Sequence, residues 1–181
     1  LVRLRRLFHA HPEIGFTEFW TTARVCETLE PLPCTLLYGE VLRAALTEPG
    51  LLDERLNPKA YDQCLKAEAE DPWIPKLKGI PGAVAIFKGK RPGPKIGFRF
   101  DMDGLPVSEP CLDTHPPFKH GFSSANGNMH ACGHDGHTAM GLGLADLISK
   151  NLEDLAGECF LLFQPAEEII QGGRVFSKLP F

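Results

Sequence analysis

The sequence has no long apolar run, no surplus of basic side chains, no internal repeat and no low-complexity tract. None of its apolar runs approaches the roughly 20 residues that a membrane-spanning helix needs, which predicts a protein without a transmembrane segment. Acidic residues (23) outnumber basic ones (19), and the formal net charge of -4 offers no basic surface to nucleic acid. With 43% hydrophobic and 23% charged residues, the composition is that of an ordinary globular domain.

Paired cysteine motifs are absent as well. The six cysteines stand singly, so they provide neither the regular ladder of a structural zinc knot nor a disulfide framework. Single thiols favour a reducing compartment, and we expect a cytoplasmic protein. The Arg-rich start, LVRLRRLFHAH, could pass for a transit peptide, but it runs directly into HPEIGF and is better interpreted as the first helix of the domain.

Metal-binding residue types are concentrated in NGNMHACGHDGH, residues 126–137. Only Gly133 separates Cys132 from His134, so the backbone can bend and direct both side chains at one ion. A thiolate with an imidazole suits zinc, while an added carboxylate broadens the choice toward manganese or cobalt. Buried Cys and His are often plain core residues, but the flanking glycines disfavour that interpretation. The segment predicts a metal site.

Two adjacent acids, Glu167 and Glu168, follow the apolar strand pattern Cys159–Phe163 through Gln-Pro-Ala. An ordinary solvated helix start would also accept such a pair. Their position directly after a buried strand instead predicts that they lie at the strand's carboxyl edge, where open α/β sheets bind ligands. One acid could then bind metal while the other transfers a proton.

A second strand pattern leads into two aspartates. Ile96, Phe98 and Phe100 alternate, and Asp101 and Asp103 follow on one face. Turn formation alone could explain an aspartate before Gly104. Beside a Cys/His/Glu site, a role next to the metal or in orienting a histidine is the better interpretation.

The remaining patterns predict a layered mixed α/β sheet with flanking helices. His9 and His11 fit structural roles better than ligand roles, and Asp135 and Thr138 fit capping or supporting roles. We expect residues 83–87 and 96–100 to be neighbouring strands around the turn KGKRPGP. Helices are expected at 1–9, from a Thr17 cap to about 30, at 58–70 and at 137–150; strands are expected at 34–38, 83–87, 96–100 and 159–163.

Four segments, in this order, resemble the metal-dependent amidohydrolase and aminoacylase family: RRLFHAHPEIGFTEF, FRFDMDGLPVSE, NGNMHACGHDGHTAMGLGLA and LLFQPAEE. That family includes hippurate hydrolases, N-acyl amino acid amidohydrolases and hydrolases of auxin conjugates. Within it, the chain most resembles the branch of the p-aminobenzoyl-glutamate hydrolases. The resemblance implies hydrolysis of the amide bond of small N-acyl or N-aroyl amino acids.

Site residues can be carried over from the family pattern. Cys132, His134 and Glu168 match metal ligands, and Glu167 matches the general acid/base. Asp103 matches an aspartate that supports the site, and Asp101 competes with it for this role. The implied cofactor is a pair of divalent ions, Mn²⁺ or Zn²⁺. Two further histidine ligands of the family lie downstream of its QPAEE motif, beyond the residues of this sequence.

The same resemblance implies the domain organisation. Residues 1–181 correspond to the amino-terminal part of a zinc-exopeptidase-like catalytic domain, with residues 40–79 as an insert and without the family's lid and dimerisation domain. As a fragment it is expected to hold metal weakly and to be inactive, because a site deprived of ligands loses affinity and geometry. The full-length protein is expected to be a homodimer or heterodimer. A non-catalytic, metal-binding partner subunit stays open as the alternative.

Overall fold

The structure is a computed structural model and describes residues 1–180. Its centre is a mixed sheet of four strands in the order β1-β2-β4-β3. Strand β4 is parallel to β3 and antiparallel to β2, and β1 is antiparallel to β2. The predicted layered α/β architecture is confirmed. The strands are β1 (Thr35–Tyr38), β2 (Ala83–Lys88), β3 (Arg91–Asp101) and β4 (Ala156–Gln164).

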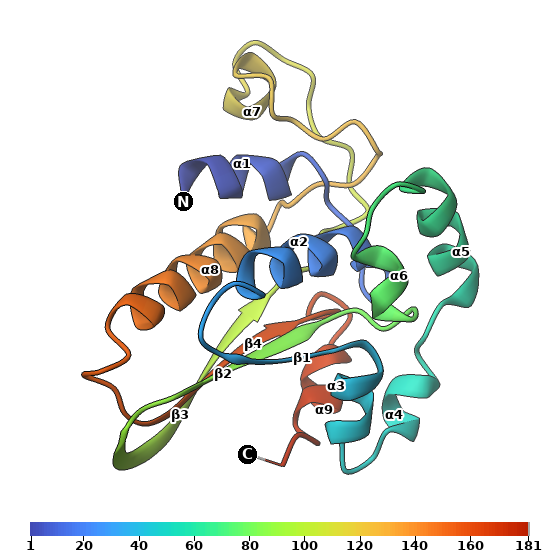
Figure 1. The fold of residues 1–181 in the computed structure, drawn as a ribbon. Coiled ribbons are helices and arrows are strands. Elements are labelled where there is room, and N and C mark those ends of the chain that lie inside the picture. The colour runs from blue at the N-terminus through green and yellow to red at the C-terminus, as the bar shows by residue number, and fades with distance from the viewer. Residues whose placement is uncertain (181) are drawn as a thin grey trace.

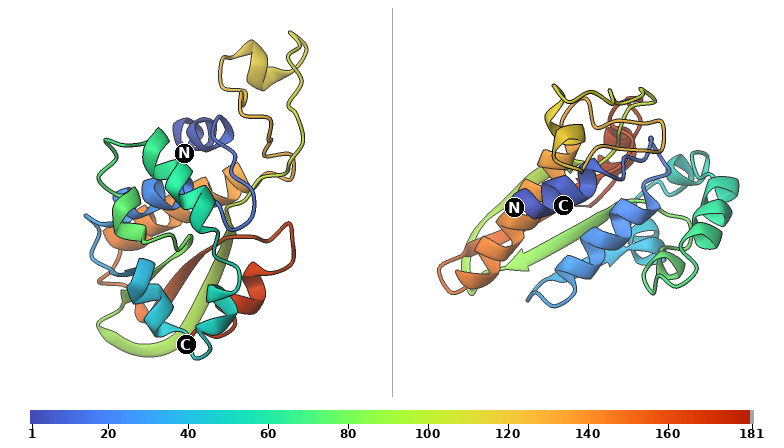
Figure 2. Two further views of the ribbon diagram at one scale, coloured as in Figure 1. Left: turned by 90° about the vertical axis from the view of Figure 1, so that its right-hand side faces the viewer. Right: turned by 90° about the horizontal axis from the view of Figure 1, so that it is seen from above.

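Helices cover both faces of the sheet (Figure 1). One face carries α1 (Val2–His9), α2 (Phe19–Leu29) and α8 (His134–Lys150). The other carries α3 (Gly39–Ala45), α4 (Gly50–Asp53) and α9 (Gly172–Phe176). Two short helices flank α2, namely α5 (Pro58–Ala67) and α6 (Ile74–Leu77), and α7 (Pro116–Lys119) lies in an excursion that projects from the body of the molecule (Figure 2).

Strand alternation explains why there are two apolar cores. Successive side chains of a strand point to opposite faces, and β2 and β4 are central strands with both faces covered. Ala85 of β2 and Phe163 of β4 belong to the core beneath α2 and α8. Val84 of β2 belongs to the second core, with Leu42 of α3 and Phe176 of α9.

The predicted pairing of residues 83–87 with residues 96–100 is wrong, because β4 lies between β2 and β3. The connection from β2 to β3 crosses the start of β4, where Gly89 N–H donates to the Gly157 carbonyl at 2.8 Å. A Cβ at Gly157, whose φ is +81°, would collide with the Pro94 carbonyl. Glycine is therefore required at this crossing. The local sequence of a turn cannot indicate whether a strand from later in the chain inserts between the two strands that the turn connects.

Helix boundaries also differ from their predictions. Helix α2 has Glu18 at its N-cap, and the predicted cap Thr17 instead bonds the Ile14 carbonyl. Helix α8 begins at His134, three residues before the predicted start, because Gly133 adopts a left-handed φ of +102° and turns the chain directly into the helix. Among the described residues, no helix is both long and apolar enough to cross a bilayer.

Candidate metal centre

Three chain segments meet at the carboxyl edge of β3 and β4. These strands are parallel, and their last residues, Asp101 and Gln164, are paired in register. The loops that follow them, carrying Asp103 and Glu168, therefore leave the sheet side by side. The first turn of α8 joins them because this helix packs on β3.

Cys132, His134 and Glu168 converge at this edge, and we call them the metal trio. One potential ligand atom from each lies within 4.8 Å of the others. His134 is buried, Glu168 is half-buried and Cys132 is exposed. The trio was anticipated from the sequence as a ligand set, and the structure brings its three side chains together.

Asp103 fixes the His134 ring. His134 Nδ1 lies 2.9 Å from the backbone carbonyl oxygen of Asp103 and 3.2 Å from the side-chain Oδ1 of Asp103. Donation from Nδ1–H leaves Nε2 free to accept a proton or bind a cation, the arrangement usual for histidine ligands. Burial lowers the pKa of His134, but the hydrogen bonds to Asp103 outweigh it and raise the pKa to about 9.

The two candidate aspartates have different surroundings. Asp103 is 1% exposed, and its Oδ2 accepts the Glu168 N–H at 2.8 Å. Asp101 instead pairs with Arg99 at 3.1 Å and lies 3.3 Å from His137 Nδ1. Of the two, Asp103 contacts members of the trio.

The adjacent glutamates approach opposite sides of the His134 ring. Glu167 Oε2 lies 3.8 Å from Nε2, and Glu168 Oε1 lies 3.7 Å from Nδ1. The Glu167 side chain is 38% exposed, whereas that of Glu168 is 16% exposed. The buried Glu168 Oε1 has no hydrogen-bond partner among the described residues. Glu168 is thus directed into the cluster, while Glu167 keeps access to solvent.

Negative charge is in excess here. Three carboxylates (Asp103, Glu167 and Glu168) and a thiol surround one imidazole. Burial, and then the nearby Glu168 carboxylate, raise the pKa of the Cys132 thiol. A divalent cation fits this set, because it would neutralise the carboxylates, satisfy the orphaned Glu168 Oε1 and lower the thiol pKa. Sulfur, nitrogen and oxygen donors together suit zinc, and the carboxylates also suit manganese.

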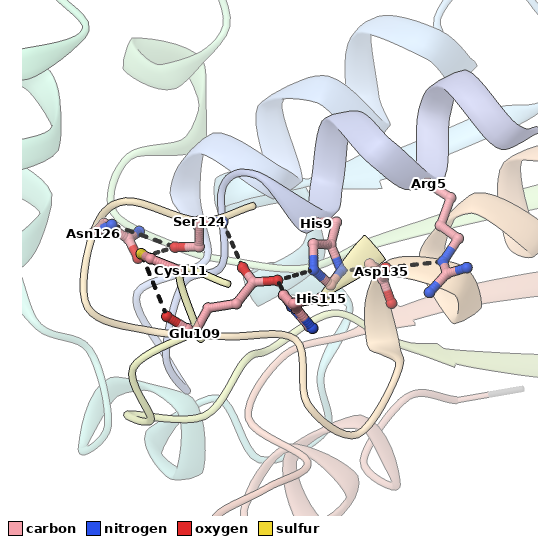
Figure 3. A network of polar contacts seen from close by, with 8 residues as sticks. All are labelled: Arg5, His9, Glu109, Cys111, His115, Ser124, Asn126 and Asp135. Carbon is pink, nitrogen blue, oxygen red and sulfur yellow. Dashed lines mark hydrogen bonds and ion pairs between the residues drawn. The ribbon is translucent and has the colours of Figure 1, made fainter. Parts of the chain in front are cut away.

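A second polar cluster begins at the next residue of α8 (Figure 3). His9 lies between two carboxylates, with Nδ1 2.8 Å from Asp135 Oδ2 and Nε2 2.8 Å from Glu109 Oε1. Arg5 Nε donates to Asp135 at 3.1 Å, and His115 Nε2 lies 2.7 Å from Glu109. We call these five residues the His9 network.

Both ring nitrogens of His9 face carboxyl groups, which only accept hydrogen bonds when they are ionised, so the arrangement favours a ring that carries two protons and a positive charge. The hydrogen bond with Asp135 raises the pKa of His9 against the opposing effect of burial. Burial would raise the pKa values of Asp135 and Glu109, but the hydrogen bonds from His9, with others, lower both. Asp135 therefore binds α1 through His9 and Arg5, which is a supporting role, while the N-cap residue of α8 is Gly133.

Sequence reasoning missed the carboxylates that organise this region. Glu13 accepts the Trp20 and Thr21 N–H groups at 2.9 and 2.8 Å and so caps α2. Glu18 is fully buried and accepts the Ala166 N–H at 2.7 Å. The sequence contained one signal for them. In HPEIGFTEF, Glu13 and Glu18 lie on either side of Phe16, and an aromatic residue between two acids is unexpected in a solvated loop. Phe16 is in fact buried.

The chain is similar to known peptidases and hydrolases. Residues 97–179 match the family model Peptidase family M20/M25/M40. The solved structure of a dinuclear metal-binding peptidase of family M20 from Bacillus subtilis superposes with a TM-score of 0.68 and 32% identity, over 98% of this chain and 38% of that one.

Residues 97–179 belong to peptidase family M20. A homolog of one p-aminobenzoyl-glutamate hydrolase subunit, from Haemophilus influenzae, is 40% identical over 98% of this chain and 42% of its own length. The corresponding hydrolase subunit from Escherichia coli is 42% identical over 94% of this chain and 39% of its own. The chain therefore spans about two fifths of the length of these relatives.

Proposed function

We propose that this M20 chain is the amino-terminal part of the catalytic domain of a metal-dependent amidohydrolase. Its substrates would be N-acyl or N-aroyl amino acids, with p-aminobenzoyl-glutamate as the first candidate. The observation that carries the proposal is a free carboxylate beside a ligand trio: Glu167 lies 3.8 Å from His134 Nε2 and is 38% exposed. A purely structural metal site has no need of this extra acid.

Cys132, His134 and Glu168 would hold one of two divalent ions, Mn²⁺ or Zn²⁺, and the remaining ligands would come from the part of the catalytic domain beyond this sequence. Bound cations supply Lewis acidity toward the amide carbonyl and the attacking water. Glu167 takes a proton from that water and delivers it to the amine nitrogen as the C–N bond breaks. Asp103 keeps the His134 ring in one tautomer and orientation.

The insert supports a role in substrate binding. Its residues Arg55 and Asn57, with Ile169 just after the glutamate pair, line a cavity of about 400 Å³. Arg55 Nε also donates to Gln171 Oε1 at 3.0 Å, which ties the insert to the segment that carries Glu167. We infer that residues 40–79 form one wall of the substrate cleft.

Assembly and location follow from the same proposal. Two of the relatives are named as one subunit of a hydrolase, which favours a full-length protein that assembles with another chain, and a homodimer is the alternative. A non-catalytic partner subunit would keep the trio without needing Glu167. The six free cysteines favour the cytoplasm.

The test is an amidase assay on the full-length protein with p-aminobenzoyl-glutamate, hippurate and an N-acetyl amino acid, each with Mn²⁺ and with Zn²⁺. Glu167→Gln should lower kcat by about 10²- to 10⁴-fold, the usual contribution of a general acid or base, while metal content stays unchanged. Loss of metal in this variant would mean that the roles of the two glutamates are exchanged. Absence of hydrolysis by the wild type under all conditions would favour the alternative of a non-catalytic partner.

A further inference from the structure

The turn that presents the two glutamates is strained. Ala166, directly before Glu167, has a φ of +56°, which is unusual for a residue with a Cβ. Ala166 is completely buried, and a Cβ added to Gly15 would lie 3.1 Å from the Ala166 Cβ. Strain of this kind persists only where the surroundings impose it, and it concentrates at functional sites.

Two buried carboxyl groups impose it by binding the backbone on either side of Glu167. Glu18 Oε1 accepts the Ala166 N–H at 2.7 Å, and Asp103 Oδ2 accepts the Glu168 N–H at 2.8 Å. Glu18 is the N-cap residue of α2, and Asp103 lies in the loop just after β3, so the turn is held from two separate parts of the fold.

Nothing else in the described surroundings of Glu18 explains an ionisable side chain at position 18. Its side chain is 0% exposed, and its Oε2 has no hydrogen-bond partner among the described residues. Helix α2 receives no side-chain hydrogen bond from this N-cap residue, because Glu13 supplies the cap instead. A carboxyl this deeply buried is costly unless a specific contact requires it.

We propose that Glu18 is a positioning residue, which holds the strained Ala166 turn through the Ala166 N–H and so directs Glu167 toward the metal trio. The inference rests on the proposed function of Glu167. Turnover would then depend on Glu18 as well as on Glu167, although the two residues are 149 positions apart in the chain. Burial, followed by the charge of Asp103, raises the pKa of Glu18 well above its usual range, so glutamine should replace it closely.

The test compares Glu18→Leu with Glu18→Gln in the full-length protein. Leucine removes the acceptor, and we expect kcat to fall by about 10²-fold with KM and metal content unchanged, because small displacements of a reacting group have effects of this size. Glutamine keeps a carbonyl oxygen at the same place and should restore kcat. Glu13→Leu is the matched control, because it removes an acceptor of backbone N–H groups from α2 without touching the turn.

Amide hydrogen exchange provides a readout that does not depend on turnover. The Ala166 amide lies outside every helix and strand, yet it should exchange slowly in the wild type and in Glu18→Gln and lose its protection in Glu18→Leu. If Glu18→Leu does not fold, Glu18→Asp, which withdraws the acceptor by one methylene, serves the same comparison and should lower both quantities partly.

Rapid exchange of the Ala166 amide in the wild type would overturn the role of Glu18, whatever the activity. Equal losses of kcat in Glu18→Leu and Glu13→Leu would also overturn it, because a general loss of stability would then explain both. Absence of hydrolysis by the wild type, with a protected Ala166 amide, would overturn the proposed function and leave the contact made by Glu18 intact.

Discussion

The first turn of α8 separates two polar clusters of opposite character. His134 belongs to the metal trio. The next residue, Asp135, belongs to the His9 network (Figure 3). In the network, two carboxylates meet the charged His9 ring and Arg5, so the charges balance. At the trio, three carboxylates and a thiol meet one imidazole.

The two clusters also differ in how exposed their side chains are. The side chains of His9, Glu109 and Asp135 are at most 4% exposed, whereas Cys132 is exposed and Glu167 is 38% exposed. A buried network is stable when its polar atoms are paired. In the His9 network both ring nitrogens of His9 and both carboxylate oxygens of Glu109 have partners, and Asp135 Oδ1 has none among the described residues. An open cluster with excess charge is a poor structural element but a suitable cation site. Two adjacent residues of one helix thus belong to clusters of different kinds, Asp135 to a buried and charge-balanced network and His134 to an open cluster with excess negative charge.

The largest effect should come from the unbalanced cluster. Glu168→Gln removes one charged ligand, and we expect divalent cation affinity to fall by more than about 100-fold, beyond the usual loss for groups that merely support a ligand. The free energy of unfolding of the metal-free protein should change by less than about 1 kcal/mol, because the charged partner of the Glu168 carboxylate, the His134 ring, lies 3.7 Å away. Calorimetric titration with Zn²⁺ and urea denaturation measure the two quantities. Unchanged affinity would assign the ligand role to Glu167.

The balanced cluster should respond in the opposite way. His9→Leu leaves the Asp135 and Glu109 carboxylates buried without their shared partner, and we expect a loss of about 3 to 5 kcal/mol in the free energy of unfolding. Arg5→Gln is the matched control in the same network. The Arg5 side chain is 57% exposed, so its loss should be below about 1 kcal/mol. Urea denaturation of both variants measures this, and similar losses would refute the central place of His9.

A smaller effect should appear in the pH dependence of stability. The folded-state pKa of His9 is raised above 6.5, so its contribution is complete below pH 6.5 and is lost as the pH rises through the raised value. The pKa values of Asp135 and Glu109 are lowered from 3.8 and 4.5, so their contribution is present above those values and is lost as the pH falls through the folded ones. The difference in unfolding free energy between wild type and His9→Gln should therefore be largest between about pH 4.5 and 6.5.

Subtracting the variant removes the contributions of other titrating groups, such as Glu13, whose pKa burial raises to about 7. Urea denaturation at a series of pH values gives this difference. A difference that stays constant from pH 5 to pH 9 would show that the His9 ring carries no extra proton in the folded state.

The long apolar and alternating patterns predicted their elements well. Helix α1, the centre of α2, and strands β2 and β4 lie where periodicity indicated, because burial of one face or both faces depends on local residue order. The short helices α3, α4, α6, α7 and α9 had no such signal, since four to seven residues are too few to establish a period.

The residues of the candidate site and its surroundings also differ in whether the sequence predicted them. Cys132, His134 and the glutamate pair were visible in the sequence because metal-binding residue types were concentrated beside glycines and a strand end. His9 and Glu18 were not, since their partners lie 126 and 148 positions away in the chain. His9 was expected to be structural, and its place between two carboxylates agrees with that expectation.

By itself, the sequence determined the residue types of the site, the main helices and strands, and the family resemblance, because each of these depends on neighbours along the chain. Only the tertiary structure decided that β4 inserts between β2 and β3, that Asp103 rather than Asp101 contacts the trio, and that Glu18 holds the turn before Glu167. These features depend on hydrogen bonds between distant segments, whose geometry exists only after the sheet and its helices have packed.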